Sequence, residues 1–307
     1  MATSLGLDIT STSLLVVGRD EQAGKTLKAR YRMDRCAAPR ACTLLLLRAI
    51  SHVRKELDDV EAIGIGFPGG VDVSRGVVKS SHVFRGWENF RIADTISSIS
   101  GLPCRIDSRT NNIARAEAAR RLNRTSMLYL HAEQRIEAAV LLGGQVWPGK
   151  RGLAGEIGHV TIDNNGHACE CGRSGCVETY ASQPAIERTL GIQADQLTKF
   201  AQAKPERANE ALCEAGTVLG TTLASALNLL DAELVVLDGA LAAFSAFRES
   251  VEYAARSNAI DEIQAGCVFE TARVGKAAGG FGAMLLGSEL ITPSHSKPVE
   301  AESQTAA

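Results

Sequence analysis

The sequence of 307 residues lacks an excess of charge, long apolar runs and a recognisable leader. Its 33 Lys and Arg residues against 35 Asp and Glu residues leave a net charge of −2, which gives no electrostatic reason to expect nucleic acid or a membrane surface as a partner. No run reaches the length of a membrane-spanning helix. No basic stretch followed by an apolar one opens the chain, so we expect no signal peptide.

The composition is that of an ordinary soluble globular protein. Hydrophobic residues make up 45% and charged residues 22% of the chain. This length suffices for one large or two ordinary domains with a substantial core. Free thiols persist in a reducing compartment, so the eight cysteines and the missing leader together favour the cytoplasm.

Four residues close in sequence have the ligand types of a zinc site. His159, Cys169, Cys171 and Cys176 lie within GEIGHVTIDNNGHACECGRSGCVETYAS. Zn²⁺ takes four nitrogen or sulfur donors in a tetrahedron, and four protein ligands leave no open position, so we expect a structural zinc rather than a catalytic one. The alternative is three buried thiols beside a surface histidine. The other cysteines are scattered in apolar or helical surroundings, at positions 36, 42, 104, 213 and 267.

Hydrophobic periodicity predicts a mixture of strands and helices. Strands are expected in a hairpin at 4–18 and at 26–33, 62–72, 102–107, 126–131, 138–147 and 235–239. Helices are expected at 41–57, 111–122, 183–190, 194–203, 205–230, 241–257 and 277–290.

The order of these elements predicts an α/β protein of two lobes. We expect a first lobe over residues 1–115, completed by the C-terminal helix 277–290, and a second lobe over residues 116–276. The last stretch, residues 291–307, is polar and contains Pro and Ser, so we expect a disordered tail.

The cysteine stretch resembles the signature of the ROK family (repressors, open reading frames and kinases). Supporting stretches are GIGFPGGVD at 64–72, GLAGEIGH at 152–159 and ALNLLDAELVVLDGAL at 226–241, so the resemblance covers about residues 4–290. It implies the two-lobed, actin-like fold of hexokinases, a ribonuclease H-like α/β fold with a cleft between the lobes. Many members are ATP-dependent sugar kinases, and others are sugar-responsive repressors with an added N-terminal helix-turn-helix.

The resemblance also implies partners. Members of the ROK family commonly form dimers. We therefore expect a homodimer or higher oligomer that binds a small sugar or sugar derivative. No helix-turn-helix precedes residue 4, so we expect no direct contact with DNA.

The resemblance implies a sugar-binding wall next to the metal. His159 and the three cysteines match the family's zinc ligands, while Glu156, His159 and Glu178 match its sugar-binding residues. Carboxylates and an imidazole suit this role because they exchange hydrogen bonds with neighbouring hydroxyl groups. Gly69 and Asn111 also belong to the implied sugar site. The alternative for Glu156 and Glu178 is an ordinary surface charge.

The phosphate side departs from the family pattern. A DxGGT-like turn is replaced by Asp-Ile-Thr-Ser-Thr at 8–12, and a GTGxGxG turn by Glu-Gln-Arg-Ile-Glu at 133–137, where a carboxylate would repel a triphosphate. Thr12, Gly239 and Gly279 remain as candidates for nucleotide contacts. Gly279 could instead allow tight helix packing.

The catalytic motif departs most. The family's NDxN becomes Ser-Arg-Thr-Asn at 108–111, so Arg109 stands at the catalytic aspartate. A guanidinium stays protonated and cannot act as a general base. Asp107, two residues earlier, shares a strand face with Arg109 and is the remaining candidate base. We expect Arg109 to bind an anionic sugar, or else to form a salt bridge with Asp107 or Glu117.

Three functions compete. The first is a sugar-sensing pseudokinase that closes on its ligand without ATP turnover. The second is an active kinase that uses Mg·ATP with Asp107 as base, since divergent loops are not fatal to phosphoryl transfer. The third is a different sugar enzyme in which Glu156, Glu178 and His159 act as acid and base groups, as paired carboxylates do in glycosidases.

Overall fold

A computed structural model describes the chain over residues 3–20, 24–34, 38–57, 59–81, 83–121 and 125–291. The expected tail at 291–307 lies outside the described residues except for Ile291, as does Cys36. Among the helices described, none is both long enough and apolar enough to cross a membrane.

The first sheet has five strands in the order β3-β2-β1-β4-β7. They are β1 (Thr3–Ile9), β2 (Ser13–Asp20), β3 (Lys25–Arg32), β4 (Val60–Phe67) and β7 (Cys104–Ser108). The first three are antiparallel neighbours, whereas β1, β4 and β7 run parallel, so their carboxyl ends meet at one edge. Helices α1 (Pro39–Val53) and α2 (Ile92–Ser100) bury their apolar residues with this sheet in one core cluster.

The second sheet has the order β10-β9-β8-β11-β12. Its strands are β8 (Met127–Ala132), β9 (Ile136–Leu142), β10 (Gln145–Val146), β11 (Leu234–Asp238) and β12 (Val268–Thr271). One face packs on helices α5 (Gln183–Leu190), α6 (Leu197–Ala203), α7 (Pro205–Leu230), α8 (Ser245–Asn258) and α9 (Asp261–Gly266), with α4 (Glu178–Ala181) beside them.

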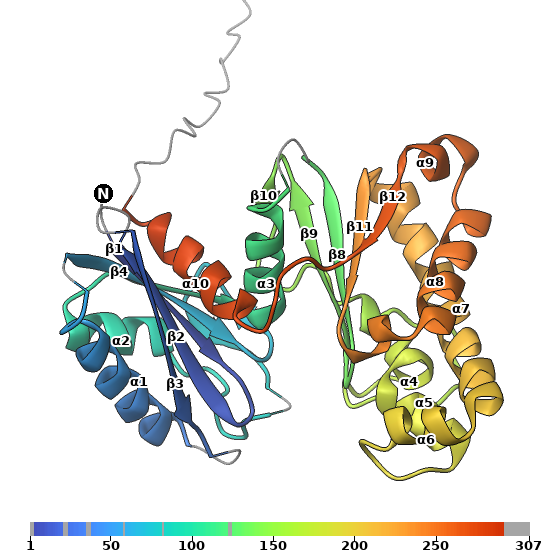
Figure 1. Cartoon of the computed structure of the whole chain (residues 1–307), viewed down its shortest axis with the longest axis horizontal. Coiled ribbons are helices and arrows are strands. Elements are labelled where there is room, and N and C mark those ends of the chain that lie inside the picture. The colour runs from blue at the N-terminus through green and yellow to red at the C-terminus, as the bar shows by residue number, and fades with distance from the viewer. Residues whose placement is uncertain are drawn as a thin grey trace, which may run out of the picture.

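Two helices lie between the sheets, as Figure 1 shows: α3 (Arg109–Ala118) and α10 (Ala278–Ser288). Helix α10 packs so closely on the first sheet that a Cβ at Gly6 or Gly64 would collide with its backbone. Ser4 Oγ donates a hydrogen bond of 2.9 Å to the carbonyl oxygen of Met284 on this helix. Within the described residues, the last helix therefore packs against the first strand.

Most predicted elements are confirmed, with differences in detail. The strand expected at 138–147 is broken into β9 and β10 because Gly143 and Gly144 both have positive φ and form a turn. The helix expected at 241–257 is broken at Phe244, whose backbone is extended, into a short 3-10 turn (Ala240–Ala243) and α8. Helix α2 and the small hairpin of β5 (Val71–Asp72) and β6 (Val77–Val78) were not predicted.

Candidate functional site

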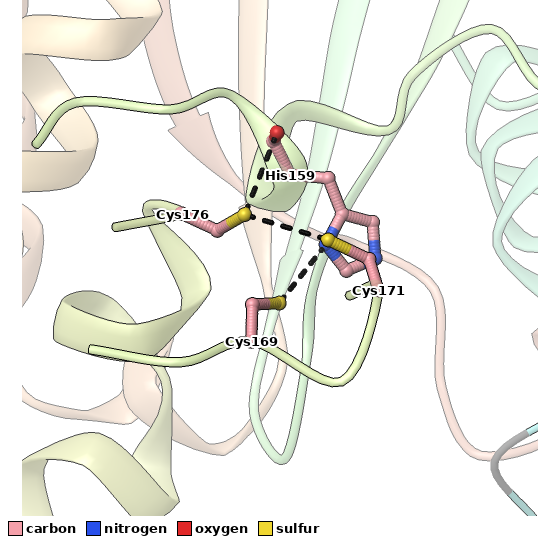
Figure 2. Close-up of side chains that lie close together, drawn as sticks. All are labelled: His159, Cys169, Cys171 and Cys176. Atoms are coloured by element: carbon pink, nitrogen blue, oxygen red, sulfur yellow. Dashed lines mark hydrogen bonds between the residues drawn. The ribbon is translucent and has the colours of Figure 1, made fainter. Parts of the chain in front are cut away.

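The three cysteines and His159 meet in one cluster, as Figure 2 shows. Their ligand atoms all lie within 4.8 Å of one another. Cys171 Sγ lies 3.6 Å from Cys176 Sγ, and Cys169 Sγ lies 3.5 Å from His159 Nδ1. These sulfur atoms are much too far apart for a disulfide bond of about 2.0 Å.

The spacing of the cluster fits a tetrahedral zinc ion. Zn–S bonds of about 2.3 Å in a tetrahedron put neighbouring sulfur atoms about 3.8 Å apart, and the Cys171–Cys176 spacing of 3.6 Å is close to this edge. The donor set of three thiols and one imidazole is also a common zinc set. The residues present therefore fit the metal predicted from the sequence.

Tight turns bring the cysteines together. Cys169 N–H donates to the carbonyl oxygen of Arg173 over 2.8 Å, and Gly175 N–H donates to that of His167 over 2.7 Å. Gly175 has φ of 68°, and a Cβ there would collide with the carbonyl oxygen of Asp163. The loop therefore requires glycine at this position.

Two residues of the cluster, His159 and Cys171, line a cavity of about 420 Å³. Four of the residues expected at the sugar line it: Gly69, Glu156, His159 and Glu178. Gly69 has φ of 150° and packs against the backbone of Ser80, which leaves no room for a side chain. Because Gly69 belongs to the loop after β4 and the other three to the second lobe, the cavity lies between the two sheets.

His159 faces both the cluster and the cavity. Its Nδ1 points at Cys169, while its Nε2 lies 3.8 Å from a carboxylate oxygen of Glu156. His159 ends the 3-10 turn Ile157–His159, and Glu156 is the residue before that turn. A metal on Nδ1 would fix the imidazole ring and leave Nε2 toward the cavity.

Glu178 is held by the protein on its other side. It begins α4, accepts a hydrogen bond of 3.3 Å from Ile136 N–H, and lies 3.4 Å from Arg135 Nε. Burial raises the pKa of Glu178 in spite of Arg135. Burial and then the charge of Glu137 also raise the pKa of Glu156. Hydroxyl groups of a ligand could donate hydrogen bonds to both carboxylates.

The cavity includes residues that were not predicted at the sugar. Arg135 and Glu137 appeared in the sequence only as replacements in a phosphate loop, yet both line this cavity. Arg135 Nη1 also lies 2.8 Å from a carboxylate oxygen of Glu170. From the first lobe, Lys79 and Glu88 line the opposite side. No sequence motif indicates a binding role for Lys79 and Glu88, because only the fold brings these residues to the cavity.

On the phosphate side, Arg109 pairs with Asp8 at the end of β1. Arg109 Nε lies 3.1 Å from Asp8 Oδ1, and the Asp8 side chain is only 2% exposed. Burial raises the pKa of Asp8 even though Arg109 opposes this shift. The predicted partners of Arg109 were Asp107 and Glu117, and this pairing is wrong because both carboxylates are taken by other arginines, Arg115 and Arg121.

Two further carboxylates on the phosphate side, Glu137 and Asp238, also have partners within the protein. Glu137 accepts a hydrogen bond from the Thr110 hydroxyl group. Asp238 accepts from the Tyr129 hydroxyl group and lies 3.3 Å from His131 Nδ1. Burial would raise the pKa of Asp238, but the hydrogen bonds from His131 and Tyr129 outweigh it and hold the value at about 2.

The three nucleotide candidates lie in different surroundings. Thr12 lines a pocket together with Arg109 and Glu137, and Gly239 lines a second one with Asp238. Gly279 begins α10 against Asp8, where a Cβ would collide with the Asp8 carboxylate. Tight packing therefore accounts for Gly279 without a nucleotide.

Asp107 and Asn111 do not line the sugar cavity. Asp107 accepts a hydrogen bond of 2.7 Å from the Asn111 side-chain amide and lies 3.1 Å from Arg115 Nη2. It lines a separate pocket with Arg105 and Arg115. To act as a base toward a sugar in the cavity, Asp107 would have to leave these partners.

The family model described as ROK family matches residues 4–289 of the chain. A related N-acetylmannosamine kinase of Yersinia pseudotuberculosis is 30% identical over 82% of this chain and 87% of its own. A glucokinase of Halalkalibacterium halodurans is 26% identical, with 76% and 78% covered.

Some relatives are repressors. The xylose repressor of Bacillus subtilis is 26% identical over 76% of this chain. The chain spans 63% of the length of that repressor and 54% of a similar Caldicellulosiruptor protein.

Solved structures agree with the fold. The ROK hexokinase of Thermus thermophilus superimposes with a TM-score of 0.82 at 29% identity, covering 94% of this chain and 99% of its own. A glucokinase of Streptomyces griseus, solved with glucose and AMPPNP, gives a TM-score of 0.75 at 22% identity, with 94% and 100% covered. The two-lobed, actin-like fold predicted from the sequence is confirmed.

Proposed function

The chain belongs to the ROK family, and we propose that it is a sugar-binding regulatory protein that has lost phosphoryl transfer. The observation that carries this proposal is the ion pair between Arg109 and Asp8. In the family pattern, the position of Arg109 holds the catalytic aspartate and the position of Asp8 opens the phosphate turn. Both positions are here engaged with each other.

The arginine at position 109 has one physical consequence, and its pairing with Asp8 has another. Arg109 cannot accept the proton of a sugar hydroxyl group, because its guanidinium stays charged at any working pH. Asp8 is neutralised by a fixed cation, so it attracts Mg²⁺ less than an unpaired carboxylate would. Phosphoryl transfer depends on positioning and charge neutralisation by Mg²⁺, and both are weakened.

The sugar would bind in the 420 Å³ cavity. Glu156, Glu178 and His159 Nε2 would exchange hydrogen bonds with its hydroxyl groups. A missing or inverted hydroxyl group would leave a desolvated carboxylate without a partner, which is a strong basis for specificity. Gly69 would contact the sugar from the first lobe, so the ligand would draw the two lobes together.

The cysteine cluster would hold a structural zinc. His159 Nδ1 and the thiolates of Cys169, Cys171 and Cys176 would be its four ligands, with no position left for substrate. The metal would supply rigidity, because it ties the segment of Glu156 to the segment of Glu178. A reducing cytoplasm suits these thiols, and a dimer remains our prediction from the family.

An active sugar kinase is the second candidate. It is favoured by the relatives named glucokinase and N-acetylmannosamine kinase. This function requires Mg·ATP and would require Asp107 to release Arg115 and turn to the sugar.

A thermal-shift titration with a sugar panel, with and without Mg·ATP, tests the proposal. A ligand that binds only the folded state raises its stability by RT ln(1 + [L]/Kd). We expect a shift with one class of sugar and none with Mg·ATP. Sugar-dependent release of ADP that disappears in Asp107→Asn would refute the loss of kinase activity and establish the second candidate.

A further inference from the structure

A pocket of about 590 Å³ lies beside α10, and none of the residues that line it lines the sugar cavity. Its floor is apolar and includes Ala116 of α3 and Phe281, Met284 and Leu285 of α10. This volume is within the range of about 300–1,000 Å³ that is usual for small-molecule sites. The pocket therefore has the size and the apolar lining of a ligand site.

Four cationic side chains line the pocket, and no carboxylate does. They are Arg19, Lys28, Arg120 and Lys276. Within the described part of the chain, none of them has an ion pair, and Lys28 Nζ rests 4.9 Å from the centre of the Phe281 ring. The sugar cavity is the opposite case, since Glu88, Glu137, Glu156, Glu170 and Glu178 line it together with Lys79 and Arg135.

The cations converge from separate parts of the fold. Arg19 and Lys28 come from β2 and β3, Arg120 follows α3, and Lys276 precedes α10. The segments after α3 and before α10 are also those that connect the two sheets (Figure 1). Unpaired like charges brought together in this way repel one another, and an anion would relieve that repulsion.

We infer that this pocket binds a small organic anion with an apolar body and a phosphate or carboxylate head. The apolar part would cover Phe281 and Met284, and the head would meet Arg120 and Lys276 in charge-assisted hydrogen bonds. The inference does not depend on whether the cleft binds a sugar, because the two sites have no lining residue in common.

Fluorescence titration of the whole chain with anilinonaphthalene sulfonate, an anionic probe with an apolar ring system, tests the site. We expect saturable binding that octyl phosphate or octanoate displaces and that octanol does not. The stronger of the two competitors identifies the head group. Arg120→Gln and Lys276→Gln should each weaken binding by about threefold to tenfold, as expected for a hydrogen bond to a charged group.

Lys199→Gln is the matched control, because Lys199 is an exposed lysine on α6, on the far side of the second sheet. Its probe affinity should equal that of the unaltered protein. Displacement by octanol as strong as by octyl phosphate would overturn the proposal, as would unchanged affinity in both Arg120→Gln and Lys276→Gln.

Discussion

The two sides of the cleft differ in whether their charged side chains face a cavity or pair with one another. On the metal side, Glu156 and His159 face an open cavity, and Glu178 is fixed by backbone and Arg135 behind it. On the phosphate side, Asp8 pairs with Arg109, and Glu137 with Thr110. Glu156 and His159 thus keep polar atoms facing the cavity, whereas Asp8 and Arg109 are paired with each other.

Under the proposed function, this difference separates ligand binding from catalysis within one fold. Hydrogen-bonding groups that are held in place and face a cavity can recognise a ligand. Charged side chains that pair with each other stabilise the protein without ligand, but they no longer attract a charged reactant.

The largest effect should come from removing the proposed zinc ion. Chelation of zinc, or Cys176→Ser, should lower the melting temperature by about 5–15 °C, because structural zinc contributes folding free energy directly. Sugar binding should be lost as well, since Glu156 and Glu178 flank the cluster. Cys213→Ser, outside the cluster, serves as the control. Substoichiometric zinc by elemental analysis, with a melting temperature that chelator leaves unchanged, would contradict this prediction.

The next effect concerns the phosphate side. Arg109→Ala leaves the Asp8 carboxylate buried and unpaired, which should lower the free energy of unfolding by about 3 kcal/mol in chemical denaturation. Adding Asp8→Asn should recover part of the loss. Arg91→Ala breaks an exposed pair with Asp94 and should cost at most about 1 kcal/mol.

Sugar affinity tells whether the two sides are independent. Arg109 does not line the sugar cavity, so Arg109→Ala should leave the dissociation constant for the sugar unchanged. A large loss of affinity in this variant would show that the two sides act as one site.

Glu178→Gln tests the metal side directly. An amide keeps the shape of the carboxylate but removes its charge, so the dissociation constant for the sugar should rise by about 10-fold to 100-fold in calorimetry. Glu210→Gln on the exposed face of α7 is the matched control. Equal affinities in the two variants would remove Glu178 from the sugar site.

Glu156→Gln should weaken sugar binding without destabilising the free protein. Burial, together with Glu137, raises the pKa of Glu156. A raised carboxyl pKa favours the folded state below the ordinary value of 4.5 and disfavours it as pH rises, so a neutral amide at pH 7 removes an unfavourable charge. A lower melting temperature than that of the unaltered protein would contradict this account.

The smallest effect is a pH dependence from Asp238. Its pKa of about 2 lies below the ordinary 3.8, so its contribution to stability is complete above about pH 4 and is lost as the pH falls toward 2. The contribution should be on the order of 1–2 kcal/mol. Asp238→Asn should flatten this part of the stability profile, and an unchanged profile would argue against the hydrogen bonds from His131 and Tyr129.

Local patterns in the sequence predicted much of the fold. The apolar runs of β1, β4 and β11 are buried over most of their length, and their composition marked them as strands. The cysteine spacing predicted the cluster because all of its ligands lie within 18 residues, His159 to Cys176. Helix α2 was missed, although its sequence IADTISSIS buries Ile92, Ala93 and Ile96 on one face.

Long-range contacts could not be predicted in this way. The salt bridge predicted for Arg109 was with a carboxylate nearby in sequence. Its partner in the structure, Asp8, is 101 residues away. The parallel order β1-β4-β7 places Asp8, Gly66 and Asp107 in one register row. The same topology turns Asp107 toward Arg115 on α3. The partner of Arg109 therefore depends on strand order, which no local motif specifies.

The close packing of α10 on β1 and β4 has a consequence for how the protein is made. The backbone of Gly6 meets that of Gly280, so the first sheet lacks one of its covering helices until the long segment between β1 and α10 has been synthesised. At about 5–20 residues per second, this delay is roughly 15–55 s. During that time the apolar face of β1 and β4 stands uncovered, and the nascent chain is open to aggregation and to capture by chaperones. Strand β1 thus reaches its native environment only after α10 has been made.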